Sequence, residues 1–176
     1  HMENMDWTET RFQFFLNNKV YYRNLSKEST APWLFDEPVN IQDFAALRWY
    51  GRLWQEAVEP VRKNTAPEFR CDISLGQFGR DTLRGICDME YIGGNTFQKT
   101  RMKQDEFILS KKKGGFVEYG SANPVSDPNL QPVLWQMAAW QRKASGVMPW
   151  QTIGSRNCWE KGERTALFYP KGDDVF

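Results

Sequence analysis

The stretch FRCDISL (residues 69–75), followed by Gly76, decides the fold because it comes directly after a long amphipathic helix. That helix is expected from Ile41 to Lys63, with Asn40 as its N-cap and Asp43 in its first turn. Its apolar positions recur at intervals of three and four residues, as one face of a helix requires: Phe44, Leu47, Gly51, Trp54, Val58 and Val61. A helix that leads into a strand in this way is typical of α/β folds.

The same alternation extends in both directions along the chain. Further strands are predicted at residues 86–92, 115–120 and 146–152, and an earlier short strand at residues 32–35. Helices are predicted at residues 7–22, 79–84, 96–112 and from Asp127 or Asn129 to Lys143. About five parallel strands with crossover helices would form either an open doubly wound sheet or part of a (β/α)8 barrel, which takes about 250 residues.

The helix before Lys143 carries one apolar stripe, formed by Leu130, Val133, Leu134, Met137 and Ala138. Pro132 is tolerable in its first turn because that backbone nitrogen needs no intrahelical partner. A stripe of this kind is typical of an amphipathic helix.

Composition excludes several classes of function. The 23 Lys and Arg residues balance 22 Asp and Glu residues, so neither a nucleic-acid surface nor a membrane patch is indicated. The basic run at residues 111–113 is interpreted as a solvated helix end. Aromatic content is high, with 8 Trp, 6 Tyr and 12 Phe, and flat rings serve either a core or a sugar-binding cleft.

Metal, disulfide and cofactor chemistry find little support in the sequence. The three cysteines, Cys71, Cys87 and Cys158, form no close pair, and the single histidine, His1, precedes Met2 in what is interpreted as a cloning remnant. We therefore expect no metal site and no cofactor. No run of 18 apolar residues and no signal peptide is recognisable, so residues 3–176 are expected to form one α/β domain whose cellular compartment stays open.

Residues at the ends of the predicted strands are the candidates for function, because sites in α/β folds gather at the strand C-termini. These are Asp36, Glu37, Asp72, Ser74, Asp88, Glu90, Tyr91, Glu118, Tyr119, Asn123, Trp150 and Gln151. Carboxylates, aromatic rings and amides are the groups that a sugar site needs. The pair Asp36–Glu37 stands out, and Pro38 is expected to hold Glu37 in extended backbone. Alternatively, Asp36 caps the following helix and Glu37 is solvated.

Three patches resemble a known enzyme group. WLFDEP (residues 33–38) resembles the catalytic strand of glycoside hydrolase family 123 and its barrel relatives. Residues 134–140 with 144–150 are similar to the last Trp-rich helix and Trp-ended strand of that group, and residues 166–173 to its Tyr-Pro-Gly segment. The resemblance implies the C-terminal part of a barrel.

The resemblance also implies a mechanism: retaining, substrate-assisted hydrolysis of 2-acetamido sugars. Glu37 would be the general acid and base, and Asp36 would orient the acetamido group, whose carbonyl oxygen attacks the anomeric carbon. Trp150 would form an apolar wall, and either Tyr91 or Tyr119 would hold the acetamido oxygen. Apart from the resemblance, Asn123 and Gln151 at the predicted strand ends, and Trp159, are also predicted to contact the sugar.

The resemblance is incomplete, because no counterparts of the family's first barrel strands or of a last helix are found. Part of a barrel would leave open strand edges, so we expect self-association through these edges. Two alternatives remain: a non-catalytic carbohydrate-binding module that stacks sugars on Trp150, Trp159 and Tyr119, and a structural or interaction protein.

Overall fold

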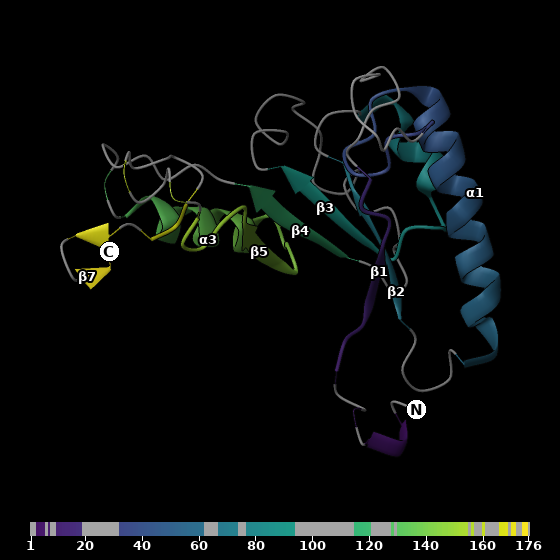
Figure 1. The fold of residues 1–176 in the computed structure, drawn as a ribbon, viewed down its shortest axis with the longest axis horizontal. Helices are drawn as coiled ribbons and strands as arrows, with labels where there is room; N and C mark the ends of the chain where they lie inside the picture. The colour runs from purple at the N-terminus through teal and green to yellow at the C-terminus, as the bar shows by residue number, and fades with distance from the viewer. Residues whose placement is uncertain are drawn as a thin grey trace. The chain divides into compact units, whose positions relative to one another are not determined.

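The computed structural model describes residues 3–5, 7, 10–18, 32–61, 67–73, 77–93, 115–120, 128, 130–154, 156, 160, 166–168, 170–171 and 174–175. Over these ranges the chain has an α/β fold, with two α-helices and five parallel strands in one sheet in the order β1-β2-β3-β4-β5 (Figure 1). The chain divides into two compact units, His1–Tyr91 with Glu106–Gly115, and Ile92–Asp105 with Phe116–Phe176.

Unit 1 is a parallel β-sheet with a helix packed on one face. After the 3-10 helix η1 (Glu3–Met5) its elements are β1 (Gln13–Phe15), α1 (Ile41–Val58), η2 (Glu59–Val61), β2 (Glu68–Asp72), η3 (Gln77–Leu83) and β3 (Met89–Gly93), which crosses the unit boundary after Tyr91. Strand β1 pairs in parallel with β2, with Phe14 opposite Phe69. Strand β2 pairs in parallel with β3, with Asp72 opposite Tyr91.

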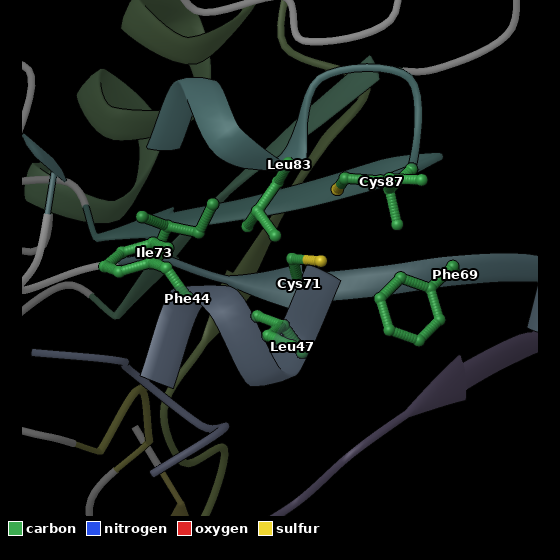
Figure 2. Packing of buried hydrophobic residues seen from close by; sticks show 8 residues of the cluster. Phe44, Leu47, Phe69, Cys71, Ile73, Leu83 and Cys87 are labelled. Atoms are coloured by element: carbon green, nitrogen blue, oxygen red, sulfur yellow. The ribbon is translucent and has the colours of Figure 1, made fainter. Parts of the chain in front are cut away.

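The core of unit 1 lies between α1, η3 and the sheet. It consists of Phe44, Leu47, Phe69, Cys71, Ile73, Leu83, Ile86 and Cys87, all nearly inaccessible to solvent (Figure 2). Burial of each large apolar side chain contributes about 1.5–3 kcal/mol. On its edge, the rings of Phe14 and Trp54 stack with centroids 4.2 Å apart. Helix α1 approaches the sheet closely at Gly51, where an added Cβ would meet Ile86 and Phe69.

Helix α1 begins as predicted, at the N-cap Asn40 with Asp43 in the first turn. The buried Asp43 carboxylate accepts hydrogen bonds from the backbone N–H groups of Leu34 (3.0 Å), Val39 (3.3 Å) and Asn40 (3.0 Å). One carboxylate therefore accepts hydrogen bonds from backbone N–H groups at the start of the helix and fixes the chain segment that leads into it.

Unit 2 holds β4 (Gly115–Gly120, of which Gly115 falls in unit 1), α3 (Gln131–Gln141) and β5 (Gly146–Pro149). Strands β4 and β5 are parallel, with Tyr119 opposite Met148. Gln151 forms a parallel bridge with Ala166, and β6 (Pro170–Lys171) pairs antiparallel with β7 (Asp174–Val175).

Helix α3 ends in a left-handed turn. Lys143 has φ 58°, and the N–H of Ala144 reaches back to the carbonyl of Ala139 at 3.0 Å. Glycine normally occupies this position of the turn, because it has no Cβ to strain the backbone.

Two predicted elements near the N-terminus are wrong. Residues 13–15 form strand β1 inside the predicted 7–22 helix, because Phe14 gains more by packing on Trp54 and Phe69 than an isolated helix would provide. Residues 32–35 form no strand: the N–H of Phe35 bonds to the carbonyl of Asn18 (3.1 Å) and that of Leu34 to Asp43. Their donors are therefore used outside any strand ladder.

The other predicted elements that the structure describes are confirmed with shifted ends, including strands β2 to β5 and helices α1 and α3. The predicted helix at 96–112 lies outside the described residues. The stripe on α3 is not buried: Leu130, Val133, Leu134 and Met137 are exposed. Among the residues that the structure describes, no helix is long and apolar enough to cross a membrane.

Candidate functional site

The candidate site lies on the sheet face of unit 1 that points away from the core. Side chains alternate between the two faces of a strand, and Phe14, Phe69 and Cys71 point into the core. Their neighbours therefore share the opposite face, which we call the polar face. It carries Gln13, Phe15, Glu68, Arg70, Asp72 and Tyr91.

Arg70 is the centre of the polar face. Its Nε and Nη2 donate to the two carboxylate oxygens of Asp72, each at 3.0 Å, in a bidentate ion pair. The guanidinium carbon lies 4.3 Å from the centroid of the Phe15 ring and 3.7 Å from that of Tyr91. Two aromatic faces and one carboxylate thus fix the orientation of a single cation.

Hydrogen bonds continue from Tyr91 toward β1. The Tyr91 hydroxyl donates to Oε1 of Gln13 at 2.8 Å, and Nε2 of Gln13 donates to Glu68 at 3.0 Å. Arg11 forms an ion pair with the same Glu68 carboxylate. A connected network of this kind holds its members in one arrangement.

Asp36 and Glu37 lie near Asp72. Burial raises the pKa of Asp72, Arg70 lowers it, and the charges of Asp36 and Glu37 both raise it again. Carboxylates whose charges interact in this way favour retention of a proton on one of them. Asp36 itself is buried, with 5% of its surface exposed.

The backbone places this acid pair beside the chain that follows β1. The N–H groups of Phe35 and Asp36 donate to the carbonyl of Asn18, at 3.1 and 3.2 Å, and Asn18 lies three residues beyond the end of β1. The Asn18 side chain in turn donates to the carbonyl of Trp33. Asp36 and Glu37 are therefore not at the end of a strand of their own, as predicted, but are bonded to the segment that leaves β1.

Glu37 adopts a left-handed backbone with φ 61°, so the extended conformation predicted for it is wrong. This conformation is unfavourable for a residue with a Cβ, and more so before a proline. The buried Pro38 and the hydrogen bonds of Asp43 hold the segment in place on both sides. Strain of this kind costs about 1–3 kcal/mol and is found frequently at functional sites.

In unit 2, two predicted site residues lie together. The rings of Tyr119 and Trp150 stack with centroids 6.1 Å apart and an interplanar angle of 25°. Tyr119 is buried, whereas Trp150 is 51% exposed, so one indole face is supported while part of the ring meets solvent. Gln151 joins this region through its backbone, whose carbonyl accepts from Leu167 at 3.0 Å.

Asn123 and Trp159 lie outside the described residues. The predicted convergence of Trp150 with Asp36 and Glu37 would join the two units, and it stays a prediction.

Three of the acids considered from sequence stabilise the fold instead. Glu90 forms a buried bidentate pair with Arg80, and burial raises the pKa of Glu90 to about 7 against the opposing effect of that cation. Asp88 accepts from the N–H of Phe69 at 2.8 Å and from Gln55. Glu118, which is fully buried, accepts two hydrogen bonds from Arg142.

From sequence, Asp72 is a candidate only by its place at a strand end, and Arg70 is not predicted at all. The available signal was the Arg70-x-Asp72 spacing, which places two opposite charges on one face of a strand. Over the described part of the chain, no group of three or more His, Cys, Asp and Glu residues is arranged to hold a metal ion.

Searches against protein-family models and against curated protein sequences found no match to this chain.

Proposed function

We propose that the polar face of unit 1, together with Asp36 and Glu37, is a glycoside-hydrolase-like site for 2-acetamido sugars. The observation that supports this most directly is that Asp36 and Glu37 lie close enough for their charges to raise the pKa of Asp72, whose partner Arg70 lies over two aromatic rings. Glycoside hydrolysis needs carboxylates in different protonation states, and neighbouring carboxylates produce that difference.

In this proposal each carboxylate has its own role. Glu37 protonates the glycosidic oxygen and then activates water, while Asp36 orients the acetamido group whose carbonyl oxygen attacks the anomeric carbon. Asp72, held by Arg70, accepts a hydrogen bond from a sugar hydroxyl. The Tyr91 hydroxyl, which now donates to Gln13, would donate to the acetamido oxygen when the sugar is bound.

The proposed architecture is the C-terminal part of a (β/α)8 barrel. Parallel strands in chain order and a core on the helix side of the sheet are consistent with it. The polar face of unit 1 would then line the barrel interior, where side chains of neighbouring strands meet.

Hydrolysis of chromogenic N-acetyl-hexosaminides tests the proposal. We expect measurable turnover by the wild type, and a loss of about 100-fold or more in kcat for Glu37→Gln and Asp36→Asn. Asp81→Asn is the matched control, because its carboxylate is exposed and its ion pair is with Arg84, three residues later in the chain. Turnover that survives Glu37→Gln, or an inactive wild type, contradicts the proposal.

A second candidate function is carbohydrate binding without catalysis, and the stacked Tyr119–Trp150 pair favours it. A half-exposed indole on a rigid support suits the apolar face of a pyranose. Titration of tryptophan fluorescence with N-acetylglucosamine oligomers would then show saturation that Trp150→Ala abolishes. Trp49→Ala, which removes an exposed indole from α1, is the control and should bind normally.

A further inference from the structure

Helix α3 exposes a continuous apolar stripe, which we call the α3 stripe: Leu130, Val133, Leu134, Met137 and Trp140. The exposed fractions are 56% for Leu130, 56% for Met137 and 79% for Trp140. Single exposed apolar residues are ordinary, but five along one helix face form a patch of the kind that marks an interaction site.

The opposite side of α3 is already anchored within unit 2. Ala139 is buried, and Trp135 Nε1 donates to Oε2 of Glu118 at 3.0 Å. Just beyond the helix, Arg142 Nη2 donates to the same oxygen at 2.7 Å. At 100° per residue, Trp135, Ala139 and Arg142 lie on one side of the helix axis and the α3 stripe lies on the other. These contacts hold α3 from one side, and none of them uses a residue of the α3 stripe. The stripe therefore faces away from them.

The charge of α3 limits what can cover the stripe. From Gln131 to Gln141 the helix contains no Asp, Glu, Lys or Arg. Helices that lie on membranes carry Lys and Arg on their polar face, and nucleic-acid surfaces are basic. The partner that covers the stripe should therefore also be an apolar helix without charges. A second copy of α3 is such a helix, and two copies would not repel each other through like charges.

We propose that the α3 stripe is a self-association surface, on which α3 of a second copy packs antiparallel across a two-fold axis. A two-fold interface places the same patch on both sides, so only one complementary surface is needed. In the antiparallel arrangement the Trp140 ring of one copy packs on Leu130 of the other, and Leu134 packs on Met137. The opposed helix dipoles also favour this orientation.

The area is at the lower limit for a dimer. The exposed parts of the five side chains amount to roughly 500 Å² per copy, so complete burial would cover roughly 1,000 Å² across the pair, the least that a biological interface needs. This surface differs from the strand edges expected from sequence, and the proposal does not depend on the sugar site.

Sedimentation velocity of the full chain, from low to high micromolar concentration, tests the proposal. We expect a reversible monomer–dimer equilibrium. Leu134→Lys should weaken it by on the order of a hundredfold, because the change acts twice across the axis and at its centre. Leu53→Lys is the matched control: it places the same charge at an exposed leucine of α1 and should leave the dimer intact. Far-UV circular dichroism checks the fold of each variant.

A charge-swap experiment gives a second, independent result. Leu134→Lys mixed with Met137→Glu should restore a heterodimer, because the two positions face each other across the axis, whereas each variant alone stays monomeric. A wild type that is monomeric at every concentration overturns the proposal. So does a dimer that Leu134→Lys leaves unchanged, which would point to the strand edges, or binding of the stripe to neutral phosphatidylcholine vesicles without dimerisation.

Discussion

The guanidinium of Arg70 lies over the ring of Tyr91, with its central carbon 3.7 Å from the ring centroid, while it holds both oxygens of Asp72. Strands β2 and β3 bring these residues together, because Asp72 stands opposite Tyr91 in the register and Arg70 is two residues earlier on the same face. The arrangement fixes a carboxylate, a cation and a phenol at one place on the sheet.

Replacement of Arg70 by lysine should therefore destabilise unit 1 despite the conserved charge. Lysine cannot form the bidentate contact with Asp72 or stack on Phe15 and Tyr91, and we expect a loss of about 1–2 kcal/mol in urea unfolding. Arg84→Lys is the control, because its ion pair with Asp81 is exposed and should cost less than about 0.5 kcal/mol. Equal effects of the two changes would contradict this interpretation of Arg70.

Glu90 should make stability depend on pH. Its pKa rises from 4.5 to about 7 on folding, mainly through burial. Because the pKa is higher in the folded state, the contribution of Glu90 to the free energy of unfolding is complete below pH 4.5. This contribution is lost as the pH rises through about 7. The loss is on the order of 3 kcal/mol. Guanidinium unfolding of wild type and Glu90→Gln measures it: the wild-type advantage should shrink over this window. A constant difference between the two proteins across it would show that Arg80 cancels the effect of burial.

Two left-handed residues offer a test of strain at the proposed site. Lys143→Gly, at the end of α3, should raise the free energy of unfolding by about 0.5–1 kcal/mol, because glycine adopts this backbone freely. Glu37→Gly should relieve similar or greater strain, yet under the proposed function it should abolish hydrolysis. If Glu37→Gly lowers the thermal midpoint while Lys143→Gly raises it, the Glu37 side chain stabilises the fold and is not a source of strain.

The sequence predicted those parts of the fold in which local pattern and tertiary packing agree. In α1 the apolar spacing, the Asn40 cap and the buried Phe44 and Leu47 all indicate one helix, and the structure has it. Agreement fails around β1, where aromatic residues spaced as on a helix instead pair with β2 at long range in sequence. No short stretch of the sequence by itself predicts that these two strands pair.

The candidate site was predictable only in part, for a similar reason. A strand end was expected at Asp36 and Glu37 because WLF is apolar, but the backbone donors of this segment bond to Asn18 and Asp43. On α3 the stripe was correctly placed on one helix face. Periodicity shows that a face is apolar, however, and not what covers it, so the exposure of Leu134 and Met137 could not be foreseen.

The close contact between α1 and the sheet should make Gly51 intolerant of any side chain. A Cβ at this position would lie 3.0 Å from Cε1 of Phe69 and closer still to Ile86, in the fully packed core. Core atoms cannot move aside without displacing others, so Gly51→Ala should cost about 1–3 kcal/mol although alanine favours helices by about 1 kcal/mol. Gly146→Ala is the control, because a Cβ there meets no atom within 4 Å and its effect should be small. Thermal unfolding of both variants measures the difference, and a Gly51→Ala variant as stable as the wild type would show that α1 packs less closely on β2 than described.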